Sequence, residues 1–199
     1  MARAENYDRD AALAAAMTVF WRKGYHATSL KDLEAALGMK PGSIYAAFES
    51  KENLYLLALT RYFEASRQGF RDQMAKAKSP LAGLAAQFQN YANLEDAHPS
   101  RQACMLMKTL IDTKSTDPKI AAISQAYLEQ MGTEFTASFE AARTAGELPQ
   151  NADTKRLARR FQANVTALRV ELQRGLPRDE ISALADDMAQ ETMRLADTI

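Results

Sequence analysis

Residues 24–51 read GYHATSLKDLEAALGMKPGSIYAAFESK, and the spacing of glycines, hydroxyls and apolar residues in this segment gives the clearest indication of the fold. Either Thr28 or Ser29 can cap a helix that Gly38 ends, because a hydroxyl oxygen accepts a backbone N–H at a helix start and glycine favours the turn after a helix end. Another short helix, the third that we expect in the chain, follows over 42–48. Two short helices separated by a tight turn containing glycine predict a helix-turn-helix.

The two short helices have distinguishable inward and outward positions. Leu33, Ile44 and Phe48 recur at helical spacing and predict a small shared core. In a helix-turn-helix the second helix lies in the major groove with its N-terminal residues toward the base edges, and a helix N-terminus favours a phosphate. From the outward positions we predict DNA contacts at Lys40, Gly42, Ser43, Tyr45, Ala46 and Lys51. The spacing is also typical of an ordinary helical hairpin with an aromatic core.

The composition of the whole chain indicates an all-α protein. Its 199 residues are 47% hydrophobic and 25% charged, which is enough apolar material for a core. Good helix formers dominate, and Gly and Pro number only 8 and 6. The net charge is zero, with 25 basic and 25 acidic residues, so the chain does not coat nucleic acid by charge alone. Residues 22–51 carry only a small basic surplus, so the DNA-binding hypothesis depends on the positions of individual residues and not on net charge.

Apolar periodicity and start and stop signals divide the chain into nine expected helices. We expect a three-helix DNA-binding head over 1–50, joined by a long helix to a helical bundle that binds ligand and dimerises over 51–199. The expected helices span 8–23, 30–37, 42–48, 51–78, 81–94, 102–113, 118–144, 154–174 and 177–198.

Cysteine and hydropathy patterns predict a soluble cytoplasmic protein. Cys104 is the single cysteine, so no intramolecular disulfide forms and a reducing compartment is expected. No apolar run approaches the roughly 18–20 residues of a membrane span, and the N-terminus lacks the apolar region of a signal peptide. The two histidines, His26 and His98, have no partner at metal-ligand spacing. We therefore expect no metal and no cofactor.

The run from 19 to 57 resembles the N-terminal domain of the TetR family of bacterial one-component regulators. It combines an apolar first helix ending in Gly-Tyr, a Thr-Ser cap, a Leu-Gly-Met turn, and a Gly-Ser-Ile-Tyr start to the third helix. The matching residues are Gly24, Tyr25, Thr28, Ser29, Leu33, Leu37, Gly38, Met39, Gly42, Ser43, Ile44, Tyr45, Phe48, Lys51 and Leu54.

This resemblance implies a homodimer that binds a palindromic double-stranded DNA operator, usually as a repressor, and is released by a small-molecule effector. It implies phosphate contacts for Thr28 or Ser29 and for Lys51, and operator contacts for Ser43 and Tyr45. It also places Lys31 where the family often contacts a base or phosphate. Alanines at 46 and 47 replace the bulkier pair common in the family, so base recognition there is weaker or purely apolar.

Aromatic and methionine side chains are frequent in the central helices, and a cavity between bundle helices is a natural ligand site. The same side chains also suit a core. The predicted ligand-binding residues are Tyr62, Ser66, Phe88, Tyr91, Cys104, Met107, Lys108, Ile111, Tyr127 and Met131.

Cys104 also suggests a sensor of oxidants or electrophiles. We expect it two residues inside a helix that starts at 102, where the helix N-terminus favours a thiolate, and Arg101 is adjacent. The alternative is an inert buried thiol.

The last two helices are expected to form the dimer. Each carries an apolar stripe that suits a four-helix bundle across a two-fold axis, although either stripe could instead pack inside its own subunit. The stripe on the eighth helix is Leu157, Phe161, Val165, Leu168 and Leu172, and the stripe on the ninth is Ile181, Leu184, Met188, Met193 and Leu195. Charged residues flank the stripes and either pair across the bundle or face water: Lys155, Arg156, Arg159, Arg160, Asp179, Glu180, Asp186 and Asp187.

Two other functional classes are weighed against a DNA-binding regulator. An enzyme lacks support, because the chain has no phosphate-binding glycine loop, no nucleophile with a plausible base and no carboxylate–histidine cluster. A helical adaptor without specific DNA binding explains the helices but not the residues at 43, 45 and 51.

Overall fold

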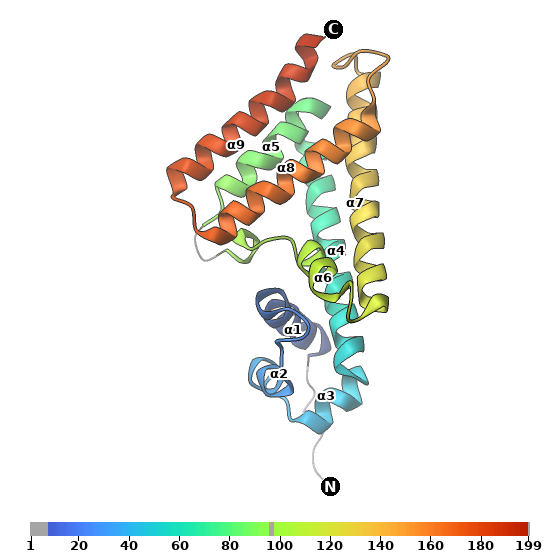
Figure 1. The fold of residues 1–199 in the computed structure, drawn as a ribbon, viewed down its shortest axis with the longest axis vertical. Coiled ribbons are helices and arrows are strands. Elements are labelled where there is room, and N and C mark those ends of the chain that lie inside the picture. The colour runs from blue at the N-terminus through green and yellow to red at the C-terminus, as the bar shows by residue number, and fades with distance from the viewer. Residues whose placement is uncertain (1–7, 96–97, 199) are drawn as a thin grey trace. The chain divides into compact units, whose positions relative to one another are not determined.

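The computed structural model describes residues 8–95 and 98–198, and within them the chain is built from helices alone (Figure 1). The all-α prediction is confirmed. None of the described helices is both long enough and apolar enough to span a bilayer. The helices are α1 (Arg9–Lys23), α2 (Leu30–Leu37), α3 (Pro41–Phe48), α4 (Lys51–Lys76), α5 (Pro80–Ala92), α6 (Met105–Thr113), α7 (Pro118–Thr144), α8 (Thr154–Arg174) and α9 (Arg178–Met193).

The observed helix ends agree with the expected ones to within about five residues. Helix α9, expected to run to 198, ends at Met193 and is followed by a 3-10 turn over Arg194–Thr198, and the start of α6 also differs. A 3-10 turn over Pro99–Arg101 precedes it, and the helix begins at Met105. The expected start at 102 is wrong. Cys104 therefore stands at the residue just before the helix and not two residues inside it, and its role as a sensor stays a prediction.

Backbone contacts divide the chain into two compact units. The first holds the described residues up to Glu64 together with Met105–Ser124, and the second holds Ala65–Cys104 and the residues from Gln125 onward. Helices α4 and α7 thus contribute residues to both units. The division of function at residue 50 stays a prediction, and its outer ends, residues 1–7 and 199, lie outside the described residues.

The core of the first unit is aromatic. Phe20 of α1 and Tyr55 of α4 meet edge to face with their ring centroids 4.8 Å apart, and both side chains are almost fully buried. Leu33 of α2 and Phe48 of α3 are buried in the same unit. Aromatic edge-to-face contacts add to the free energy of burial, so α1 to α3 are fixed on the start of α4.

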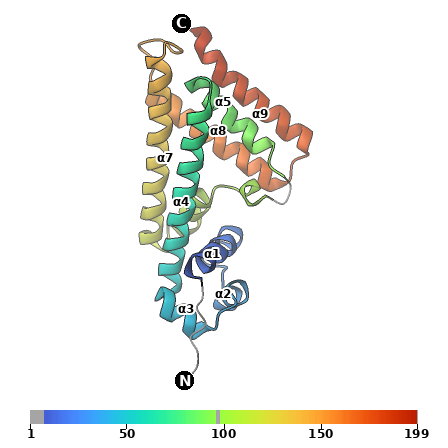
Figure 2. The same ribbon diagram turned by 180° about the vertical axis from the view of Figure 1, so that it is seen from behind.

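The core of the second unit centres on Phe161 of α8. Its ring lies 5.0 Å from the ring of Phe88, 5.1 Å from that of Phe135 and 6.0 Å from that of Phe139, measured between centroids. Helices α5, α8 and α9 lie side by side in both views of the ribbon (Figures 1 and 2).

The apolar stripe expected to form the dimer surface on α8 is buried inside this second unit. Phe161, Val165, Leu168 and Leu172 expose 9% of their surface or less, and the fifth member, Leu157, is half-buried. These four side chains are packed within their own chain, which is the alternative left open for this stripe. The opposite side of α8 is the side that remains exposed.

Candidate nucleic-acid interface

A reciprocal capping box starts α2. The backbone N–H of Asp32 donates to Oγ of Ser29 over 3.2 Å, and the backbone N–H of Ser29 donates to Oδ2 of Asp32 over 2.9 Å. Lys23 lies 2.5 Å from the other oxygen of the same carboxylate. The bond from Lys23 and the bonds from Ser29 hold the pKa of Asp32 well below its usual range. Gly38 then ends α2 in the left-handed conformation, with φ of 63°.

Helix α3 starts without a side-chain cap. Pro41 occupies the first turn, where its missing N–H costs nothing, and Lys40 at the cap position makes no side-chain capping bond. Gly42 and Ser43 are exposed at this end, so an anion can approach the start of the helix closely. Ile44 and Phe48 hold the other side of the helix in the core.

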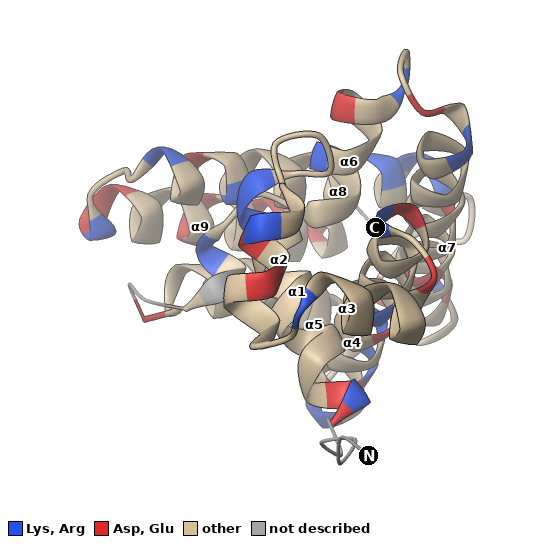
Figure 3. Cartoon of the chain, turned by 90° about the horizontal axis from the view of Figure 1, so that it is seen from below, with Lys and Arg blue, Asp and Glu red and all other residues tan. Residues whose placement is uncertain are grey.

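Most of the predicted DNA-contacting residues lie at the surface of α2 and α3. Tyr45 exposes 46% of its surface, which is unusual for a large side chain in this protein. Helix α3 has no charged residue between Pro41 and Phe48, and its ribbon is tan in Figure 3. Of the nine predicted residues, the exposed ones are Ser29, Lys31, Lys40, Gly42, Ser43, Tyr45 and Ala46.

Thr28 is placed differently from this group. It is fully buried, and its hydroxyl donates to the carbonyl oxygen of Gly24 over 2.6 Å. The hydroxyl therefore closes the turn after α1, and the phosphate contact predicted for it is wrong. Of the two adjacent hydroxyls, only that of Ser29 reaches the surface.

Lys51, at the start of α4, is half-buried. Its ammonium lies 4.6 Å from the centre of the Tyr25 ring, a cation–π contact. Burial lowers the pKa of Lys51, and the charge of Asp117 opposes that shift. Its phosphate contact stays a prediction.

The first unit also contains bonds between the region of the helix-turn-helix and α6 or the turn after it. Nε2 of His26 lies 2.8 Å from Oγ1 of Thr116 and 3.0 Å from Oδ2 of Asp117. The ammonium of Lys108 donates to the carbonyl oxygen of Trp21, at the end of α1, over 2.8 Å. The sequence assigns His26 no role, and no local signal reveals one, because its partners Thr116 and Asp117 lie 90 and 91 positions further along the chain.

A cavity of about 290 Å³ lies between α1 and α6 in this unit. Phe20, Trp21 and Tyr55 supply apolar walls, and Lys108 and Ile111 are two of the predicted ligand-binding residues that line it. Ile111 exposes 74% of its surface, more than any other large apolar side chain among the described residues.

The predicted ligand-binding residues are divided between the two units. Met107, Lys108 and Ile111 belong to the first unit with Tyr62, whose ring packs edge to face on Trp21. In the second unit, Phe88 is fully buried in the core. The others in the second unit are Ser66, Tyr91, Cys104, Tyr127 and Met131.

Known protein families match both the N-terminal and the C-terminal part of the chain. Residues 12–58 match the family described as bacterial regulatory proteins, tetR family, and residues 80–193 match the tetracyclin repressor-like C-terminal domain. The HTH-type transcriptional repressor ComR of Escherichia coli is 30% identical over 92% of this chain and 88% of its own. The uncharacterized HTH-type transcriptional regulator YezE of Bacillus subtilis is 28% identical over 80% of this chain and 82% of its own.

Solved structures share the fold. A cysteine mutant of the TetR family regulator CifR, complexed with 26 bp double-strand operator DNA, is 27% identical to this chain. It superimposes with a TM-score of 0.82 over 95% of this chain and 98% of its own. A transcriptional regulator from Cytophaga hutchinsonii reaches a TM-score of 0.81 at 21% identity, over 96% of this chain and 94% of its own.

Proposed function

The chain belongs to the TetR family of bacterial regulatory proteins, and from this membership we propose that it is a homodimeric repressor released from a palindromic operator by a small molecule. As a family member it is a DNA-binding transcriptional regulator. The family's members regulate transcription rather than catalyse reactions, and we assign this chain the same role, in the cytoplasm.

One observation carries the assignment of the DNA-contacting surface. At the start of α3, Ser43 and Tyr45 are exposed while Ile44 and Phe48 are buried, so the core fixes which side of the helix faces outward. A helix held in this way can enter the major groove with its N-terminal residues at the base edges. In this proposal Ser43 and Tyr45 contact the operator.

Positive charges on either side of α3 supply the phosphate contacts in this proposal. Lys31 and Lys40 are exposed on α2 and at the start of α3, and Lys51 begins α4. Ser29 and the backbone N–H of Gly42 add neutral donors at the two helix starts. Three lysines in each of two subunits neutralise about six phosphates, which predicts a slope of log K against log salt of about −5.

Base recognition in this proposal is partly apolar. Ala46 is exposed on α3, and its methyl group can contact the methyl group of thymine but cannot donate or accept a hydrogen bond. The surface therefore recognises fewer base-pair positions than one with a polar side chain at 46.

The experiment measures fluorescence anisotropy of labelled DNA from the region upstream of the protein's own gene, at salt concentrations from 50 to 300 mM. The expected result is saturable binding with a salt slope of about −5. Absence of binding to every candidate operator, or binding that does not depend on salt, would favour the alternative of a helical adaptor.

Release by an effector is proposed to act through α6. This helix is bonded to the end of α1 through Lys108 and to α4 through the hydrogen bond of 2.7 Å between the hydroxyls of Tyr55 and Thr109. A ligand that displaces α6 therefore acts directly on the helices that carry the helix-turn-helix. It releases DNA only if it binds the DNA-incompetent conformation more tightly.

A further inference from the structure

We propose that the cavity between α1 and α6 binds a small apolar carboxylate, and that this ligand draws the ammonium of Lys108 away from the end of α1. All of the residues that line the cavity lie in the first unit. This inference rests on the effector-released regulator proposed above, and it adds the place where the effector binds and its chemical class.

Apolar side chains line the cavity from both sides. Phe20 and Tyr55 are almost fully buried and packed edge to face, so the core holds this side in place. Ile111 lines the cavity from α6 and exposes 74% of its surface. A ligand with an apolar body that covers Ile111 removes this surface from water, which favours binding. The volume of about 290 Å³ is at the lower end of the usual range for ligand sites, so the ligand is a small one.

The ammonium of Lys108 is the cationic group in this cavity that lacks an ion pair. It donates to the carbonyl oxygen of Trp21 over 2.8 Å and lies 3.5 Å from that of Arg22. Among the described residues, no carboxylate forms an ion pair with it. Burial lowers the pKa of Lys108, and the charge of Asp112 opposes that shift. The ammonium is therefore partly removed from water and bonded to neutral oxygens alone, so a carboxylate is a stronger partner for it.

The other charged groups of the cavity do not reverse this preference for an anion. Lys23 is already paired with Asp32, over 2.5 Å. Asp112 follows Lys108 by four residues on α6 and is exposed, whereas Lys108 is half-buried. Water and salt screen an exposed charge more than a partly buried one. Asp112 therefore weakens the attraction of an anion without cancelling it.

Lys108 stabilises the C-terminal end of α1. The carbonyl oxygens of Trp21 and Arg22 belong to the last turn of this helix, where carbonyl groups lack a partner within the helix and a cation is favourable. Helix α1 packs on α2, the first helix of the candidate DNA-binding surface. A carboxylate that binds the ammonium competes with both carbonyl oxygens, so it loosens α6 from the helix on which α2 packs.

The fluorescence of Trp21 reports binding in the cavity, because Trp21 is the single tryptophan of the chain and lines the cavity. The probes are octanoate and octanamide, which have the same apolar chain and differ in the charge of the head group. Octanoate is expected to change the fluorescence saturably, with a dissociation constant of about 1 mM or below. Octanamide is expected to bind at least about tenfold more weakly, because an ammonium bonds a neutral oxygen less strongly than a carboxylate.

Two variants test the polar part of the site. Lys108→Gln removes the cation and is expected to weaken octanoate binding at least about tenfold, with octanamide binding within about threefold of the wild type. Asp112→Asn removes the opposing charge and is expected to tighten octanoate binding about two- to threefold, with octanamide binding unchanged. Lys114→Gln is the matched control, because it removes an exposed lysine of the same unit that does not line the cavity. Its octanoate binding should equal that of the wild type.

A third variant tests the apolar part of the site. Ile111→Gln replaces an exposed side chain and is expected to weaken the binding of both probes severalfold, because the apolar surface at the edge of the cavity is lost. If Lys108→Gln is unfolded by circular dichroism, the variants of Ile111 and Asp112 replace it, since neither of these side chains is buried.

The outcomes separate this inference from the proposed function, because operator binding is measured on the same proteins by fluorescence anisotropy. Octanoate is expected to weaken operator binding by the wild type and not by Lys108→Gln. Octanoate that binds as expected to a protein without operator binding would support the carboxylate site and overturn only the proposed regulator. Three results would overturn only this inference: no saturable binding of octanoate at 10 mM, equal affinity for the two probes, or octanoate binding that none of the cavity variants changes. Octanoate that binds in the cavity without weakening operator binding would overturn the cavity as the effector site.

Discussion

At the scale of single residues, the hydroxyl of Tyr55 links α4 to α6. The single proton of the Thr109 hydroxyl goes to the carbonyl oxygen of Met105, 2.7 Å away, so Tyr55 is the donor in its bond of 2.7 Å to Thr109. Tyr55 exposes only 1% of its surface, and burial raises its pKa to about 12. The folded protein therefore favours the protonated, neutral hydroxyl of Tyr55.

Replacing Tyr55 with phenylalanine tests this bond through its dependence on pH. The folded pKa lies above the unfolded value, so the tyrosine stabilises the fold fully below pH 10, and this stabilisation is lost as pH rises toward 12. Tyr55→Phe is expected to lower the free energy of unfolding by about 1 kcal/mol at pH 8 and to remove part of the alkaline loss. Urea unfolding at pH 8 and pH 10.5 measures both, and a parallel loss in the two proteins would contradict the assignment.

Single residues also show where sequence reasoning reached its limit. The inward positions of Ile44 and Phe48 predict that Ser43 and Tyr45 face outward, and the burial pattern agrees. Thr28 and Ser29 are chemically alike and adjacent, so their sequence did not distinguish them. The hydrogen bond to Gly24 depends on the fold of the turn after α1 and separates the two.

At the scale of elements, the capping box of α2 positions one side of the candidate DNA-binding surface. Ser29→Ala removes the acceptor for the N–H of Asp32 and is expected to lower the free energy of unfolding by about 1 kcal/mol. Ser43→Ala, at a serine that is also exposed but lies inside α3, serves as the control and should leave stability within about 0.5 kcal/mol of the wild type. Equal losses in the two variants would show that the cap does not stabilise α2.

Helices α4 and α5 approach each other closely at Gly83. A Cβ added there would lie 2.7 Å from Sδ of Met74 and 2.9 Å from Cβ of Ala77. Gly83→Ala is therefore expected to lower the free energy of unfolding by about 1–3 kcal/mol. The control is Gly69→Ala in α4, where the added Cβ meets nothing within 4 Å and the helix should gain about 0.5–1 kcal/mol. Thermal unfolding of both variants measures the difference, and stabilisation by Gly83→Ala would contradict the close approach.

The start of α6 differs from the start expected from the sequence because of hydrogen bonds to α8. The carbonyl oxygen of Gln102 accepts bonds from Nε and Nη2 of Arg169, and the backbone N–H of Ala103 donates to Gln173. Both partners lie on α8, nearly 70 residues away. These bonds hold the backbone of Gln102 and Ala103 in a non-helical conformation. The helical propensity of the sequence near 102 does not predict them.

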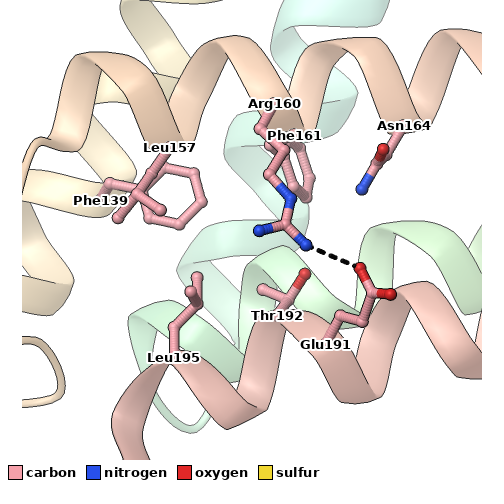
Figure 4. Close-up of a pocket in the computed structure, with 8 residues that line it drawn as sticks. All are labelled: Phe139, Leu157, Arg160, Phe161, Asn164, Glu191, Thr192 and Leu195. Atoms are coloured by element: carbon pink, nitrogen blue, oxygen red, sulfur yellow. Dashed lines mark hydrogen bonds and ion pairs between the residues drawn. The ribbon is translucent and has the colours of Figure 1, made fainter. Parts of the chain in front are cut away.

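For the molecule as a whole, the sequence predicts the order of the helices and the functional class of the protein. It does not predict which surface forms the dimer. An apolar stripe on a helix predicts that its side chains are buried, but not whether they are buried within one chain or between two. On α8 the stripe around Phe161 is internal. The charged residues beside it are visible in the sequence, but the pairing of Arg160 on α8 with Glu191 on α9 depends on the antiparallel course of the two helices (Figure 4).

Coupling between effector and operator is a property of the whole molecule. A compound found by its ability to release labelled DNA is expected to bind the free protein about 5–150 times more tightly than the DNA complex, because the two binding free energies are linked. Isothermal titration with and without saturating operator measures the ratio. Equal affinities would rule out a release that works by shifting the population of conformations.

DNA binding by the exposed side of α2 and α3 is tested by the salt dependence of operator binding by Lys40→Ala. Lys40 is exposed at the start of α3, and Lys78, exposed in the second unit, is the matched control. Loss of one phosphate contact in each of two subunits is expected to make the slope of log K against log salt less steep by about 2. Lys78→Ala should leave the slope unchanged. A Lys40→Ala slope equal to that of the wild type, or an equal change in Lys78→Ala, would contradict the assignment of this surface.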